Sequence, residues 1–147
     1  MNNQITHEPD DHPEAVQQAD AGARAWRAVV HAQQSATADH SDFYDLAGHL
    51  VDTLAAVESL ARVLAGQVAG YGDAQPAGQR VYDDSRTVDP GLRLNDAVLD
   101  LGHLADAAAV ARGDADRFWS AIGHIGVEDT PTSAGPHAGP ADGGVSR

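Results

Sequence analysis

Residues 41–70 read SDFYDLAGHLVDTLAAVESLARVLAGQVAG, and their apolar repeat decides the fold. Apolar side chains recur every seven positions in two interleaved series: Phe43, Leu50, Val57, Leu64 and Tyr71, and Ala47, Leu54, Ala61 and Val68. This spacing places one apolar stripe along a helix, as in helices that pair in a coiled coil. Ser41 and Asp42 suit the helix start, and Gly70 and Gly72 suit its end. At 1.5 Å per residue such a helix is about 45 Å long.

A second long helix is predicted over residues 90–123. Asp89 followed by Pro90 is typical of a helix cap with proline at the first helical position. Two further seven-residue series follow: Leu94, Leu101, Ala108, Ala115 and Ile122, and Ala97, Leu104, Ala111, Phe118 and Ile125. Gly123 and Gly126 mark the end of this helix.

A shorter helix is predicted over residues 14–34, where an amphipathic stripe comprises Val16, Ala19, Ala23, Trp26 and Val30. The polar connection 72–89 is longer than usual between packed helices. Residues 1–13 form an acidic tail broken by prolines, and residues 128–147 form a Gly/Pro-rich tail. Both are predicted to be disordered, which leaves one helical domain over residues 14–127.

These elements predict an all-α protein built on an antiparallel hairpin of the two long helices. The expected register pairs Phe43 with Phe118, Leu50 with Ala111, Val57 with Leu104 and Leu64 with Ala97, and it makes an Arg62–Asp100 ion pair plausible. One hairpin cannot hide all of its apolar stripes. We therefore expect the shorter helix to complete a three-helix bundle, with Trp26 against the alanine run 105–111, or a second copy to complete the core.

The composition excludes several classes of function. Twenty-two acidic and nine basic residues give a net charge of −13, and no lysine is present. This charge argues against direct binding of nucleic acid or of an anionic membrane surface. The absence of cysteine removes thiolate chemistry and cysteine-ligated metals. No apolar run has the length of a membrane span, and residues 1–13 carry no secretion signal, so a cytoplasmic protein is expected.

No catalytic or cofactor-binding motif is present, and no cofactor, catalytic residue or enzymatic activity is predicted. Metal binding has two weak candidates. His49 stands between Asp45 and Asp52 at helical spacing, and His103 stands between Asp100 and Asp106. The two groups do not converge in the expected register, and the Glu-x-x-His pattern of helical di-metal proteins is absent. The polar His7–His12 segment is interpreted as a solvated tail.

The segment 118–126, FWSAIGHIG, is the most apolar and aromatic part of the chain. Adjacent residues of a helix cannot share one stripe, so either Phe118 or Trp119 should be partly exposed or covered by a partner. Tryptophan is a favoured anchor at protein interfaces. The candidate interaction residues are therefore Trp119, Phe118 and Trp26, although packing in the core explains Trp119 as well.

An acidic, cysteine-free helical hairpin with arginine as its only strongly basic residue resembles, in architecture, the secreted WxG-type hairpins of actinobacteria. Their motif is missing, because Trp26-Arg27-Ala28 and Trp119-Ser120-Ala121 contain no Trp-x-Gly. The block from Asp42 to Ile125 with its Gly/Pro tail is similar to small uncharacterised actinobacterial proteins, some of them carried on mobile elements. This resemblance implies a small helical protein and brings no catalytic residues.

We therefore expect a non-catalytic helical module that binds a protein partner or itself. Three alternatives remain open. They are an acidic DNA mimic or regulatory protein of a mobile element, a secreted WxG-like hairpin that lacks the motif, and a metal-binding helical protein that uses His49 or His103.

Overall fold

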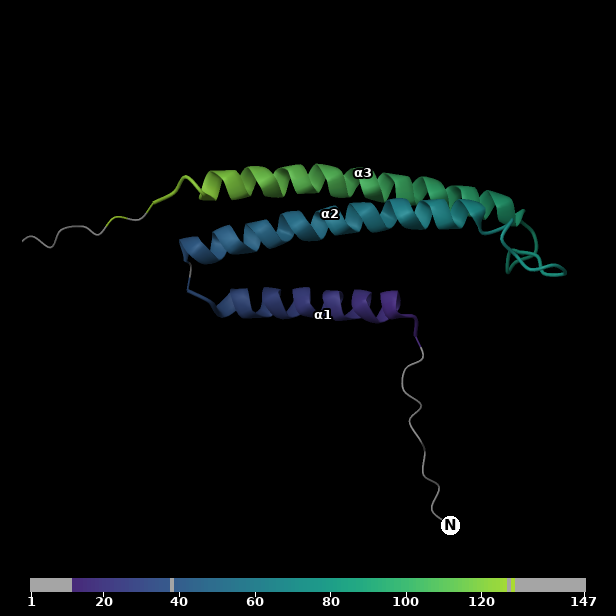
Figure 1. Ribbon diagram of the computed structural model, residues 1–147, viewed down its shortest axis with the longest axis horizontal. Coiled ribbons are helices and arrows are strands. Elements are labelled where there is room, and N and C mark those ends of the chain that lie inside the picture. Colours follow the sequence, from purple (N-terminus) through teal and green to yellow (C-terminus); the bar gives the residue numbers. More distant parts are fainter. Residues whose placement is uncertain (1–11, 38, 127, 129–147) are drawn as a thin grey trace, which may run out of the picture. The chain divides into compact units, whose positions relative to one another are not determined.

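The computed structural model describes residues 12–37, 39–126 and 128. Within these ranges the chain forms three α-helices and no strand: α1 (Glu14–Ser35), α2 (His40–Gly70) and α3 (Pro90–Ile122) (Figure 1). The all-α class is therefore confirmed, and every helix starts and stops within one residue of the range that its pattern indicated. The two tails predicted to be disordered lie outside the described residues, apart from residues 12, 13 and 128.

Helix α1 follows Pro13, whose carbonyl accepts the backbone N–H of Val16 at 2.9 Å. Glu14 places a negative charge in the first turn, where the helix dipole favours it. Residues up to Asp39 form one compact unit, and the chain from His40 onward forms another. The predicted docking of the first helix onto the hairpin therefore stays a prediction.

Helices α2 and α3 pack against each other along their lengths and run in opposite directions (Figure 1). The Asp89 side chain caps α3 by accepting the Gly91 N–H at 2.8 Å. Pro90 fits the first turn because proline has no backbone N–H, and an N–H at this position would have no acceptor within the helix. At the other end the Gly123 N–H donates to the Trp119 carbonyl at 3.0 Å. These local signals explain why the helix limits could be predicted closely.

Four alanines form the centre of the seam between the two helices. Ala47 and Ala105 are 0% exposed, Ala61 is 2% exposed and Ala108 is 5% exposed. Small side chains let two helix backbones approach closely, at the short end of the usual 8–10 Å between axes. Half-buried residues extend the seam in both directions; they are Val51, Leu54, Ala65 and Val68 on α2, and Val98, Leu101, Ala115 and Ile122 on α3.

The seam differs from the expected register in one respect. The series through Ala47 and Ala61 on α2 and the series through Ala108 on α3 are covered, as expected. The other two series lie at the margin of the seam. Five of their large members are 37–48% exposed: Leu50, Val57, Leu64, Leu104 and Phe118. Tyr71 and Ile125, at the ends of the series, are 53% and 56% exposed, and Phe43 is half-buried. Contacts across the seam join Gly48 with Trp119 and Glu58 with Arg112, which are offset from the predicted pairs, so the predicted pairing was wrong. The physical reason is that the alanine faces allow the closer approach, which leaves the larger side chains at the edge.

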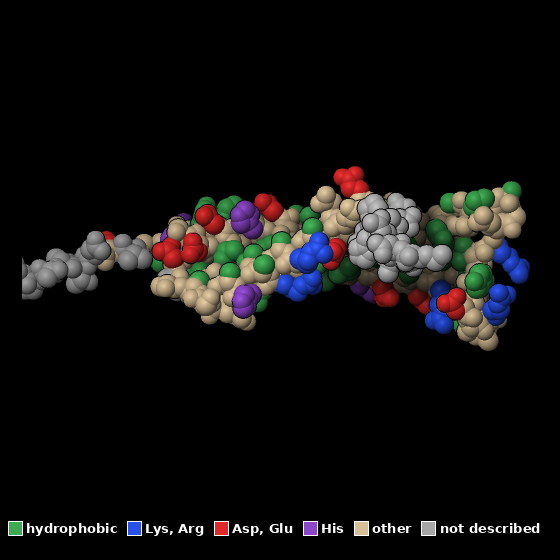
Figure 2. Space-filling view, turned by 90° about the horizontal axis from the view of Figure 1, so that it is seen from below, with side chains coloured by type: hydrophobic (Ala, Val, Ile, Leu, Met, Phe, Trp, Pro, Cys, Tyr) green, Lys and Arg blue, Asp and Glu red, His purple; other side chains and the backbone are tan. Residues whose placement is uncertain are grey.

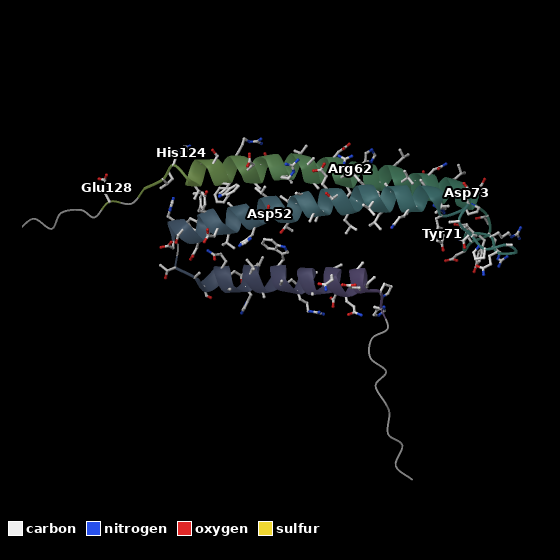
Figure 3. All side chains as sticks on the ribbon, viewed as in Figure 1. Asp52, Arg62, Tyr71, Asp73, His124 and Glu128 are labelled. Carbon is white, nitrogen blue, oxygen red and sulfur yellow. The ribbon has the colours of Figure 1, made fainter. Side chains whose placement is uncertain are left out.

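Charged side chains cross the seam near its middle. Glu58 is 20% exposed and accepts from Arg62 Nη2 at 3.1 Å, while Arg112 Nη2 lies 3.5 Å from its other carboxylate oxygen. Arg62 is labelled in Figure 3. Its Nη2 lies 3.7 Å from Asp106 Oδ1, so Asp106 takes the place that was predicted for Asp100 in this ion pair. Because the arginine side chains of these pairs are 43–57% exposed, each pair contributes little to stability, roughly 0–1 kcal/mol. Their main effect is to favour one register.

The described helices do not include one that is both long and apolar enough to span a bilayer.

Candidate functional site

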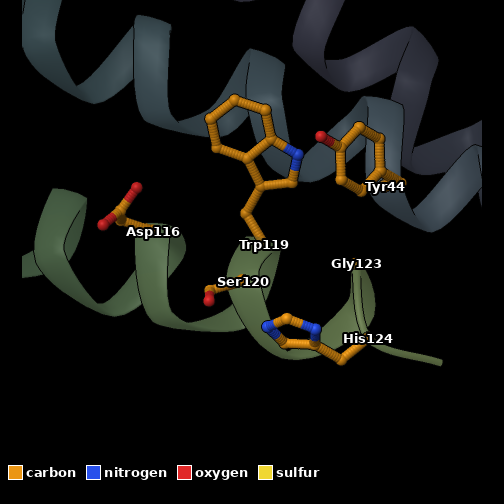
Figure 4. Close-up of a pocket in the computed structure, with 6 residues that line it drawn as sticks. All are labelled: Tyr44, Asp116, Trp119, Ser120, Gly123 and His124. Atoms are coloured by element: carbon orange, nitrogen blue, oxygen red, sulfur yellow. The ribbon is translucent and has the colours of Figure 1, made fainter.

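Trp119 closes the end of the hairpin where α2 begins and α3 ends. Its indole lies over Gly48 of α2, where an added methyl group would meet Cζ2 at 3.6 Å. The ring centroids of Trp119 and Tyr44 are 5.4 Å apart at 52°, a favourable tilted geometry (Figure 4). His40 strengthens this end, because its Nε2 donates to the Ile122 carbonyl at 2.7 Å. This end therefore holds an aromatic pair that joins the two helices.

Two shallow hollows open beside this aromatic pair. The first has a volume of about 300 Å³ and is lined by Tyr44, Asp116, Trp119, Ser120, Gly123 and His124 (Figure 4). The second has a volume of about 240 Å³ and is lined by Tyr44, Asp45, Gly48, His49, Asp52 and Trp119. Aromatic walls with carboxylates at the rim can hold a small apolar or cationic group. Among the described residues, the enclosed Nε1 of Trp119 has no hydrogen-bond partner.

Phe118 takes the opposite role from its neighbour Trp119. Its side chain is 44% exposed, whereas Trp119 packs on α2. The structure thus separates the two candidate interaction residues: Trp119 contributes to the hairpin itself, and Phe118 contributes to its surface. Trp26 lies on α1 in the other unit, and its predicted role as an anchor stays a prediction.

Phe118 belongs to a band that we call the apolar flank, composed of Leu50, Val57 and Leu64 on α2 and Ala97, Leu104, Ala111 and Phe118 on α3. Each member follows a seam residue of its own helix by three positions. A step of three residues turns a helix by about 300°, and the two helices run in opposite directions, so both rows fall on the same side of the hairpin. The apolar flank is therefore one surface that spans both helices.

The other side of the seam has a different chemistry. The residue directly after each seam residue lies about 100° around the helix, on the side opposite to the apolar flank. These residues have small or charged side chains: Gly48, Ala55 and Arg62 on α2, and Gly102, Ala109 and Asp116 on α3. Asp45 and Asp52 line the hollow on this side. The hairpin therefore has one apolar flank and one flank of small and charged side chains, which we call the acidic flank after Asp45, Asp52 and Asp116.

The loop between α2 and α3 is organised around Asp83. Its carboxylate accepts the Ser85 N–H at 3.1 Å and also the Ser85 hydroxyl, and Arg93 Nε donates to it at 3.3 Å. These contacts, the Ser85 hydroxyl foremost and then Arg93, hold the pKa of Asp83 below its usual 3.8 against the opposing effect of desolvation. The Arg86 guanidinium lies 4.8 Å from the centroid of the Tyr82 ring.

Arginine and aspartate side chains gather at this loop end of the hairpin (Figure 2). A hollow of about 280 Å³ there is lined by Arg80, Val81, Tyr82, Asp83, Arg86, Val88 and Pro90. Arg86 itself has a φ of 55°, in the left-handed region that non-glycine residues seldom adopt. The contacts around Asp83 therefore hold a loop whose backbone is locally unfavourable.

The weak metal candidates stay apart. His49 lies on α2 and His103 on α3, and both side chains are exposed. Within the described ranges, no three His, Cys, Asp or Glu side chains lie together in a way that could hold a metal ion. His49 instead borders the smaller hollow near Trp119.

Sequence reasoning missed two residues at the aromatic end, Tyr44 and His40. A signal for Tyr44 was available, because Tyr44 and Gly48 are four residues apart and so lie on one face of α2. The largest side chain of α3, Trp119, packs where α2 offers its smallest residue. The hydrogen bond from His40 to the Ile122 carbonyl at the end of α3 could not be predicted, because no sequence pattern relates the two residues.

Comparison with known proteins gives no relative: no family model, no curated protein and no solved structure matches this chain.

Proposed function

We propose that this protein is a non-catalytic helical interaction module and that its apolar flank binds a protein partner. One observation carries the proposal. Large apolar side chains stay 37–48% exposed along one continuous side of the hairpin, in a chain with a net charge of −13. Contiguous exposed apolar surface on an otherwise strongly charged protein marks interaction sites. In this proposal the protein acts in the cytoplasm, as the sequence led us to expect.

The flank also offers a shape that suits helical partners. Along α3 the flank alternates small with large residues, Ala97, Leu104, Ala111 and Phe118, which leaves gaps over the alanines between larger side chains. Apolar side chains of a helix can enter such gaps at helical spacing. The aromatic pair Tyr44–Trp119 joins the ends of the two helices that present this surface.

The proposal is tested by replacing two flank residues and two matched residues elsewhere. Val57→Asp with Leu104→Asp charges the middle of the flank. Val63→Asp with Val110→Asp makes the same kind of change at sites that are 55% and 68% exposed and lie away from the flank. Proteins retained from a host extract are identified by mass spectrometry, and binding is then measured again with each purified protein.

The proposal requires at least one purified protein, this chain included, that binds the wild type and the control variant and fails to bind the flank variant. Binding that is equal for all three chains would refute it. The same assay separates the DNA-mimic alternative, because a basic partner held by the acidic flank would survive the flank substitutions and would be released by salt.

A further inference from the structure

We infer that the occupant of the apolar flank is the same flank of a second copy of this chain, in a symmetric dimer. The inference rests on the proposed function and names its partner. Its first observation is that the seam of the hairpin buries few and small side chains. Only alanines are fully enclosed, and in the described part of the chain no large side chain falls below 2% exposure. The larger apolar side chains thus lie where a second layer of helices would cover them.

The size of the flank fits a dimer interface. From Ala97 to Phe118 the flank extends over 21 residue steps of α3, which is about 30 Å at 1.5 Å per residue. Two packed helices are about 20 Å wide, so the flank measures about 600 Å². Two such faces bury about 1,200 Å² in total, above the roughly 1,000 Å² that marks a specific interface.

Charge favours a second copy over a basic partner. All seven positions of the flank are uncharged, although the whole chain carries a net charge of −13. A partner selected by its positive charge would need carboxylates within this band, and Asp45, Asp52 and Asp116 lie on the other flank. A second copy brings an equally uncharged face, and salt screens the remaining repulsion beyond about 8 Å at physiological ionic strength.

The order of side-chain sizes along the flank is also compatible with two-fold symmetry. Phe118 stands at one end of the α3 row and Ala97 at the other, with Leu104 and Ala111 between them. When two copies meet with their helices reversed, the aromatic end of one flank lies over the small end of the other. An isologous contact of this kind places large groups against small ones and closes the assembly at two copies.

The test is the mass of the full chain in solution, measured by sedimentation velocity and light scattering across a wide concentration range. The wild type and the Val63→Asp/Val110→Asp control should be dimers, and dimerisation should strengthen with added salt. The Val57→Asp/Leu104→Asp variant should dimerise at least about 100-fold more weakly, because each charge would be buried without a partner. Far-UV circular dichroism checks that every variant keeps its helices. If the double variant loses helical signal, Phe118→Asp at the end of the flank takes its place.

Two results would overturn the inference. A wild type that is monomeric at every concentration excludes the dimer. This holds also if the reason for the monomer is that the chain's own α1 covers the flank. A dimer that survives the flank substitutions but dissociates in the control places the interface elsewhere. A monomeric wild type that still binds another purified protein through the flank would refute the dimer and leave the proposed function intact.

Discussion

Replacing Ala61 by leucine tests the alanine seam most sharply. Ala61 is 2% exposed in the middle of α2, and Ala105, 0% exposed, belongs to the matching face of α3. A leucine adds three carbon atoms where the close approach of two backbones leaves no space. Overpacking of this kind costs about 1–3 kcal/mol. In a domain of this size each kcal/mol lowers Tm by about 4–8 °C, so Ala61→Leu should melt roughly 4–24 °C below the wild type.

Ala56→Leu is the matched control, since Ala56 is exposed on the same helix. The same change there should alter the free energy of unfolding by no more than about 0.5 kcal/mol. Thermal and urea unfolding followed by far-UV circular dichroism measures both variants. If Ala61→Leu proved as stable as Ala56→Leu, the seam would not lie where the structure places it.

Three further predictions follow from local geometry. Gly66→Ala should raise the free energy of unfolding by about 0.5–1 kcal/mol, because an added Cβ meets no atom within 4 Å and alanine is the better helix former; unchanged or lower stability in urea unfolding would contradict this. Trp119→Ala should lower that free energy by about 2–4 kcal/mol, and a Tm equal to that of the wild type would show that the aromatic pair does not hold the hairpin ends together. Asp83 has a lowered pKa in the folded protein, so its charged form stabilises the fold above the usual pKa of 3.8, and this contribution disappears as the pH falls through the lower folded value. The stability difference between wild type and Asp83→Asn should therefore shrink below about pH 4, and a difference that does not change with pH in acid unfolding would refute the Asp83 assignment.

Helix limits were predictable because local residues set them. Asp89 and Pro90 start α3 through a side-chain cap and a fixed backbone angle, and Gly123 ends it. Such signals act within one turn of the chain and do not depend on the partner helix.

The choice of seam was not predictable in the same way. Both series on α2 are apolar, so hydropathy gave no reason to prefer Ala61 over Val57. The choice depends on how closely two backbones approach, and this is decided by the pair of helices together. The same limit applies to Trp119, whose position over Gly48 depends on a register that neither helix specifies alone.

The candidate site was predicted only in part. Sequence reasoning selected Phe118 and Trp119 together, and the structure gives them different surroundings: an exposed flank for the first and contacts with α2 for the second. Neither the Arg112–Glu58 contact nor the link from Arg93 to Asp83 could be read from spacing. Both join residues that the hairpin and its loop bring together only after folding.

The central claim is that α2 and α3 form a hairpin that presents Val57 and Leu104 on one shared flank. Because the chain has no cysteine, Val57→Cys with Leu104→Cys creates the only two sites for spin labels. Pulsed electron paramagnetic resonance on labelled protein, diluted with unlabelled chain, measures the distance within one molecule. The account predicts a narrow distribution centred below about 20 Å, as expected for neighbouring faces of helices packed 8–10 Å apart. A broad distribution, or one centred far beyond the width of two helices, would contradict it.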